Sequence, residues 1–74
     1  MTKKSAGEQV YRVIDVVGTS PRSWEEAAKS AVETASKSLR DIRIGEVSRM
    51  DVKVENGKVV AYRTRVQLSF KYEA

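Results

Sequence analysis

Residues 59–72 form a long run of regular alternation between apolar and polar side chains. Its even positions are mostly apolar: Val60, Tyr62, Thr64, Val66, Leu68, Phe70 and Tyr72. Its odd positions are mostly polar: Arg63, Arg65, Gln67, Ser69 and Lys71. A period of two predicts a strand with one dry face and one polar face, longer than the usual length of about five or six residues. A chain of 74 residues has too little material to cover both faces of such a sheet, so we expect an assembly.

The composition limits how so small a fold can be stabilised and what chemistry it can perform. The chain has no cysteine and no histidine, which excludes disulfides, thiolate metal sites and the commonest general base. Any metal would have to be a hard cation held by oxygen atoms, such as calcium or magnesium. Oligomerisation is then the favoured stabiliser of this single small domain, and without a nucleophile–base pair we expect no enzyme.

The net charge is +4 and the sequence pI is about 9.6. The basic residues are scattered among acidic ones and form no block, so nucleic-acid binding is not favoured. The first residues lack the apolar run of a secretory signal, and no stretch approaches the length of a transmembrane helix. The expectation is a cytoplasmic protein without a membrane partner.

The first half of the chain predicts a strand followed by a helix. Residues 9–17 are rich in valine and isoleucine and predict the strand, and residues 18–21 (Gly-Thr-Ser-Pro) predict a break. Ser23 and Glu26 fit a capping box, after which apolar residues at spacings of three and four predict a helix from Trp24 to about Ser38. Trp24 is expected to anchor the start of this helix in the core.

The second half predicts two more strands joined by a hairpin. In residues 42–54 the apolar side chains Ile42, Ile44, Met50, Val52 and Val54 share one parity, and Gly45 suggests a bulge, a bend or a close backbone approach. Asn56-Gly57 then predicts a tight hairpin into the last strand. A right-handed crossover leaves the first two strands parallel with the third between them. The predicted fold is α+β, in the order β-α-β-β, with sheet order 1-3-2 packed on one helix.

Several segments in this order resemble the dodecin family. They are Val10-Tyr11-Arg12-Val13-Ile14, Val17-Gly18-Thr19-Ser20-Pro21, Ser23-Trp24-Glu25-Glu26-Ala27-Ala28, Leu39-Arg40-Asp41-Ile42-Arg43 and Val66-Gln67-Leu68-Ser69-Phe70-Lys71. The polar residues 1–8 are expected to form a disordered tail, and the resemblance implies a dodecin domain over residues 9–74. It also implies a hollow homododecamer that stores flavin (riboflavin, FMN or FAD) at subunit interfaces without catalysis.

The resemblance also supplies candidate ligand-binding residues and two departures from the family's flavin binders. In those binders a tryptophan stacks on the flavin ring and a glutamine hydrogen-bonds to its edge; Ile44 and Arg63 stand at these positions here. Isoleucine cannot stack and arginine cannot accept a hydrogen bond, so we expect weakened flavin affinity. The pattern resembles the subgroup associated with calcium, which implies a shell that holds calcium, or a purely structural one, as the alternative.

The candidate residues can be interpreted in two ways. The ligand-binding candidates are Arg43, Ile44, Gly45, Arg63 and Arg65, and the metal-binding candidates are Glu46 and Asp51. Arginine pairs well with phosphate oxygens, so the three arginines could line an anionic pocket shared between subunits. The competing interpretation is ion pairing between subunits, with Glu46, Asp51 or Glu55 as the partners.

Overall fold

The computed structural model describes residues 10–71, with the exception of the side chain of Lys71. The elements are β1 (Tyr11–Ser20), α1 (Trp24–Ala35), β2 (Ile42–Glu55) and β3 (Lys58–Lys71). The sheet has the order β1-β3-β2, and β3 is antiparallel to both neighbours. This confirms the predicted β-α-β-β fold and strand order. The expected tail over residues 1–8 lies outside the described residues.

The β1–α1 connection explains why β1 is longer than predicted. Gly18, Thr19 and Ser20 continue to pair with β3 as far as Tyr62, so the chain leaves the sheet only at Pro21. Gly18 also allows α1 to approach closely, because a Cβ atom there would lie 2.0 Å from the Ala27 carbonyl oxygen. Such a contact leaves room only for glycine.

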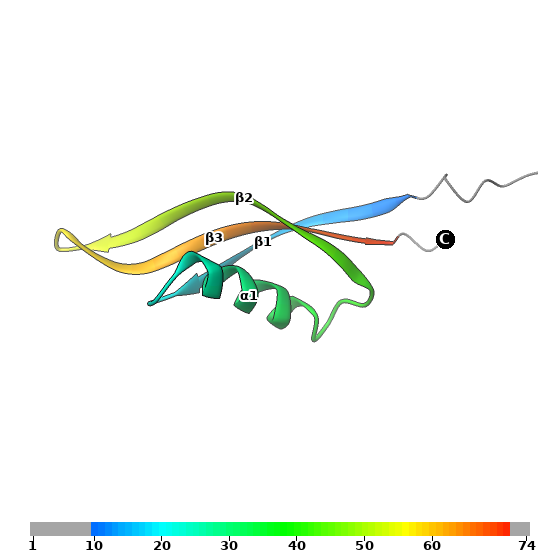
Figure 1. Cartoon of the computed structure of the whole chain (residues 1–74), viewed down its shortest axis with the longest axis horizontal. Helices are drawn as coiled ribbons and strands as arrows, with labels where there is room; N and C mark the ends of the chain where they lie inside the picture. Colours follow the sequence, from blue (N-terminus) through cyan, green and yellow to red (C-terminus); the bar gives the residue numbers. More distant parts are fainter. Residues whose placement is uncertain (1–9, 72–74) are drawn as a thin grey trace, which may run out of the picture.

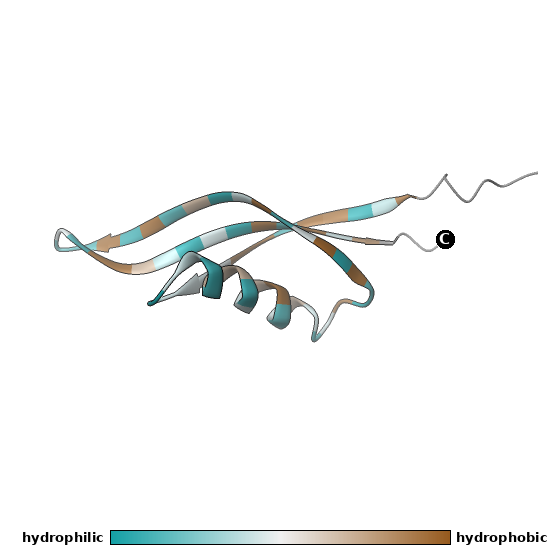
Figure 2. Ribbon diagram, in the orientation of Figure 1, coloured by the Kyte–Doolittle hydropathy of each residue, from teal (hydrophilic) through white to brown (hydrophobic). Residues whose placement is uncertain are grey.

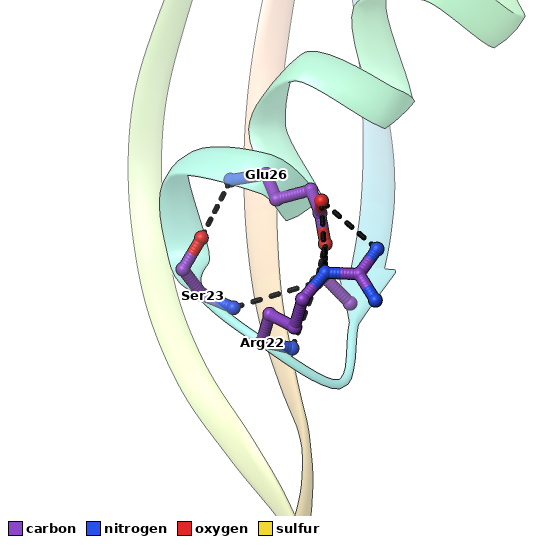
Figure 3. A network of polar contacts seen from close by, with 4 residues as sticks. Arg22, Ser23 and Glu26 are labelled. Atoms are coloured by element: carbon purple, nitrogen blue, oxygen red, sulfur yellow. Dashed lines mark hydrogen bonds and ion pairs between the residues drawn. The ribbon is translucent and has the colours of Figure 1, made fainter.

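A polar network fixes the start of α1 (Figure 3). The backbone amide of Glu26 donates to the Ser23 hydroxyl at 3.0 Å, which confirms the predicted N-cap. The hydroxyl of buried Ser20 donates to the Glu26 carboxylate and accepts from the Arg22 amide at 2.9 Å. Arg22 completes the network with a hydrogen bond from its Nη2 atom to Glu26 Oε2 at 2.9 Å.

The helix ends earlier than predicted, at Ala35 rather than Ser38. The Ser36 hydroxyl donates to the Val32 carbonyl at 2.8 Å, and the amides of Lys37 and Ser38 bond to carbonyls three residues back. These short-range bonds tighten the chain into a turn. Serine side chains that bond to the backbone in this way compete with continued helix.

The core lies between α1 and the middle of the sheet. Ala31 of the helix is buried against Val66 and Leu68 of β3, and Ala27 is fully buried one turn earlier. The hydroxyl of buried Thr64 donates to the Trp24 carbonyl at 2.9 Å. Because even-numbered residues of β3 are the buried ones, they identify the side of the sheet that faces α1.

The β2–β3 hairpin extends beyond the helix and beyond the end of β1 (Figure 1). It turns at Asn56 and Gly57, whose φ angles of 52° and 75° confirm the predicted tight turn. The radius of gyration is 16.0 Å, whereas a compact domain of this length has about 11 Å. The protomer is therefore an elongated ribbon carrying a small core.

Candidate functional site

The helix-free face is the surface of the sheet opposite α1, and the strand register identifies its residues. In an antiparallel pair, residues directly opposite each other point to the same side. The face therefore carries Val13, Asp15, Val17 and Thr19 from β1, Arg63, Arg65, Gln67 and Ser69 from β3, and Ile44, Glu46, Arg49, Asp51 and Lys53 from β2. The charged β2 residues of this face alternate in sign, in the order Glu46, Arg49, Asp51 and Lys53. Figure 2 shows the hydrophilic and hydrophobic residues that alternate along β2.

Irregularities in β2 redistribute its apolar residues between the two faces. The register with β3 shifts between Ile42 and Ile44, between Val47 and Arg49, and between Lys53 and Val54. Each shift changes which parity faces the helix. The prediction that the apolar residues of β2 share one face was therefore wrong: Ile42 and Met50 lie on the helix side, whereas Ile44 lies on the helix-free face. Gly45 lies on the helix side, where a Cβ atom would be 3.3 Å from Val66 Cγ1, in keeping with the close approach expected there.

The predicted ligand-binding residues are spread along the protomer. Ile44, Arg63 and Arg65 share the helix-free face, Gly45 faces the core, and Arg43 lies in the first irregularity of β2. Ile44 is 56% exposed and pairs with Ser69. The strand from Ser69 to Arg63 spans roughly 20 Å, so one protomer does not bring Ile44 and Arg63 to the same point. A pocket that uses both residues needs a second copy of the chain.

Arg63 is held by Asp51, which lies directly opposite it in β2. The Arg63 Nε atom donates to Asp51 Oδ1 at 2.7 Å, and Nη2 donates to Oδ2 at 2.9 Å. These hydrogen bonds lower the pKa of the Asp51 carboxyl group and raise the pKa of the Arg63 guanidinium. The geometry is the bidentate form in which arginine holds a carboxylate best, so the two side chains satisfy one another within the protomer.

The two predicted metal ligands lie on the same face but do not form a site within one protomer. Glu46 pairs with Gln67, and Asp51 pairs with Arg63. Over residues 10–71, no three acidic side chains gather closely enough to hold a metal ion. A cation bound through Glu46 or Asp51 would need oxygen atoms from another copy.

Trp24 is the first residue of α1 and connects the helix to β2 from the helix side of the sheet. Its indole Nε1 donates to the Asp51 carbonyl oxygen at 2.9 Å. Its ring meets the Tyr62 ring edge-on, with 5.1 Å between centroids. The side chain is 38% exposed, so the expected core anchor lies at the edge of the core rather than inside it.

The sequence analysis did not single out Arg49 as a site residue. Arg49 lies directly opposite Arg65 on the helix-free face, and Asp15 approaches the same place, with its Oδ2 atom 3.7 Å from Arg65 Nη1. In the sequence, Arg49 is an arginine within a strand whose faces were assigned from the alternation of its residues. The irregularity between Val47 and Arg49 hid its face.

The helix leaves part of the apolar surface of the sheet uncovered. On the helix side of β2, Met50 is 59% exposed and Val47 is also exposed. At the hairpin, Val54 and Val59 are 56% and 52% exposed. Isolated two-stranded hairpins are marginal in water, and apolar areas of this kind mark association surfaces. These features define a small β-α-β-β protein with exposed apolar surfaces of the kind through which chains associate.

The chain belongs to the dodecin family. The sequence model described as Dodecin matches residues 10–73, and calcium dodecin of Mycobacterium tuberculosis is 47% identical over 62 residues, which cover 84% of this chain and 87% of that protein. A crystal structure of M. tuberculosis calcium dodecin, described as calcium-chelating with a novel calcium-binding site, matches with a TM-score of 0.76 and 48% identity over 86% of this chain and 91% of that chain. Dodecin of Streptomyces coelicolor matches with a TM-score of 0.83 and 35% identity over 92% of this chain and 97% of that chain.

The helix of the described region is not of the kind that crosses a membrane. Across residues 10–71, no helix combines the length and apolar character that a bilayer span requires.

Proposed function

We propose that this chain forms a dodecin-type homododecamer that binds and holds a small ligand at subunit interfaces without catalysing a reaction. The observation that carries the proposal is that two residues of the candidate site lie far apart within one protomer. Ile44 and Arg63 share the helix-free face but are separated by roughly 20 Å of strand. The exposed apolar residues of β2 and the hairpin supply the surface through which copies would meet.

Flavin is the ligand implied by the family, and we propose that this chain binds it weakly. Ile44 offers the flavin ring an aliphatic contact but no stacking partner, and stacking contributes about 0.5–1.5 kcal/mol beyond area burial. Arg63 is engaged by Asp51 through two hydrogen bonds. A flavin edge that approached Arg63 would have to compete with that carboxylate.

The second proposed function is a shell that holds calcium. Its support is the similarity to calcium dodecin of M. tuberculosis. Glu46 and Asp51 are the acidic candidates on the helix-free face, and their oxygen atoms suit calcium, or magnesium in a site with more water ligands. Because Asp51 already binds Arg63, Glu46 is the freer ligand of the two.

Two titrations on the purified full-length protein distinguish these ligands. Fluorescence of free FMN should be quenched only weakly at protein concentrations of tens of micromolar if flavin binding is weak. Unchanged FMN fluorescence would exclude flavin as a ligand. Strong quenching at low protein concentration would contradict the weakened flavin affinity attributed to Ile44 and Arg63. Calorimetry with calcium, repeated with Glu46→Gln, tests the second function; no heat with the native protein would exclude it.

The absence of catalysis and a cytoplasmic location stay predictions. On the helix-free face the arginines are interspersed with Asp15, Glu46 and Asp51 and form no continuous basic stripe, so the face offers little to a nucleic-acid backbone. Weak retention on DNA at low salt, lost as salt rises, would be the sign of a purely electrostatic contact.

A further inference from the structure

The helix-free face contains a pair of arginines, of which only Arg65 was among the predicted ligand-binding residues. Arg49 of β2 and Arg65 of β3 are register partners. Side chains directly opposite each other have Cβ atoms about 4.5–5.5 Å apart, and like charges in that position destabilise a sheet. The register therefore places two arginine side chains directly opposite each other on an exposed surface, at a cost in stability.

The acidic neighbours compensate this pair incompletely. Asp15 approaches Arg65 at 3.7 Å, with both side chains about half exposed, and a surface ion pair of that kind contributes little. Asp51 is committed to Arg63, although Arg65 and Arg49 both help to lower its pKa. Among residues 10–71, Arg49 has no hydrogen bond or ion pair with an acidic side chain. One positive charge on this face is left without a partner.

The surroundings of the pair favour a small anion. Val17 pairs with Arg65 from the β1 side, and Ser48 anchors the backbone there, its hydroxyl donating to the Arg65 carbonyl at 3.3 Å. The row Val17, Arg65, Arg49 thus has an apolar end and a cationic end. A phosphate group has enough oxygen atoms to accept hydrogen bonds from two guanidinium groups at once.

We infer that Arg49 and Arg65 together form an anion subsite on the helix-free face that takes the phosphate group of a small phosphorylated ligand or free phosphate. The inference deepens the proposed function, on which it rests, by assigning a negative charge to the ligand. The proposed anion contact lies at Arg49 and Arg65 rather than at Arg63, because Arg63 is paired with Asp51. An anion there also removes the repulsion between the two arginines, so binding and sheet stability are coupled.

The test compares thermal unfolding of the native protein, Arg49→Gln and the control Arg40→Gln in phosphate and in chloride at matched ionic strength. Arg40 lies in the loop before β2, is exposed, and carries the same charge. In chloride, Arg49→Gln should unfold at a higher temperature than the native protein because the repulsion is gone. In phosphate, the native protein and Arg40→Gln should gain several degrees, whereas Arg49→Gln should gain only the general salting effect.

Further arms identify the source of the anion and separate this inference from the proposed assembly. Competition between FMN and phosphate, but not between riboflavin and phosphate, would assign the subsite to a phosphate ester; phosphate binding without such competition would assign it to the free anion. An equal phosphate shift in native and Arg49→Gln protein overturns the inference. So does dissociation of Arg49→Gln, which would show that a carboxylate of a neighbouring copy is the partner. Light scattering on the same samples reports the assembly independently of the phosphate shift.

Discussion

Arg63 and Asp51 lie opposite each other in β3 and β2 and are joined by two hydrogen bonds of 2.7 and 2.9 Å. One was predicted to bind a ligand and the other a metal ion. Because the two side chains pair, Arg63 is less available to a ligand and Asp51 is less available to a metal ion. The backbone carbonyl oxygen of Asp51 also accepts a hydrogen bond from the Trp24 indole. The pair is therefore connected to the start of α1.

Restoring the two flavin-binding side chain types should restore flavin binding. The double substitution Ile44→Trp and Arg63→Gln supplies a stacking ring and an amide that both donates and accepts. We expect the FMN affinity to rise by about twofold to tenfold from stacking alone, which contributes about 0.5–1.5 kcal/mol, and further from the hydrogen bonds of the amide. The measurement is quenching of FMN fluorescence, with Val54→Trp as the control for a tryptophan elsewhere on an exposed strand. An unchanged affinity would show that Ile44 does not lie at the flavin position.

The stability of the protein should fall in acid through two carboxylates. Hydrogen bonds from Ser20 and then Arg22 lower the pKa of Glu26 below its ordinary value of 4.5, and Arg63 lowers that of Asp51 below 3.8. A lowered pKa in the folded state means that the unfolded state binds more protons, so the stabilisation is complete above the ordinary values and is lost as the pH falls through the folded-state pKa. The free energy of unfolding, measured by urea denaturation, should be nearly constant from pH 7 to about 5 and should decline at lower pH. Glu26→Gln should start lower and decline less; an unaltered decline would contradict the assignment.

Gly18 should tolerate no side chain. A Cβ atom there would lie 2.0 Å from the Ala27 carbonyl oxygen and 2.9 Å from Ala31 Cβ, so Gly18→Ala must push α1 away from the sheet. We expect a loss of about 3 kcal/mol in the free energy of unfolding, measured by urea denaturation. The matched control is Gly45→Ala, where the nearest atom would be a valine methyl group at 3.3 Å. Equal costs at the two positions would refute the close backbone contact.

Removing the Ser20 hydroxyl should destabilise the β1–α1 connection. This buried group donates to Glu26 and accepts from the Arg22 amide. Ser20→Ala removes the acceptor of the Arg22 amide and leaves the Glu26 carboxylate with Arg22 as its remaining partner. We expect a cost of about 1–3 kcal/mol in the free energy of unfolding. Ser36→Ala removes a hydroxyl that bonds only to the exposed end of α1 and should cost much less. If both variants unfold alike, the network in Figure 3 contributes nothing specific.

Local patterns predicted the fold, whereas contacts between strands decided the site. Alternation in residues 59–72, the Ser23 cap and Asn56-Gly57 are short-range signals, and each predicted element is present, although β1 runs on to Ser20 and α1 ends at Ala35. The face assignments in β2 failed because each register shift reverses the parity, and no local residue pattern locates a shift. The Arg63–Asp51 pair and the Arg49–Arg65 juxtaposition depend on register across two strands, which residue spacing alone does not fix.

The size of the protein in solution tests the central claim most directly. Native mass spectrometry or light scattering at micromolar concentration should give one species of about twelve times the 8.3 kDa mass of the chain. It should keep its β-sheet circular dichroism on dilution, because in the proposed dodecamer other copies cover the exposed residues of β2 and the hairpin. A stable, folded species of 8.3 kDa would contradict the account and the shared ligand site with it.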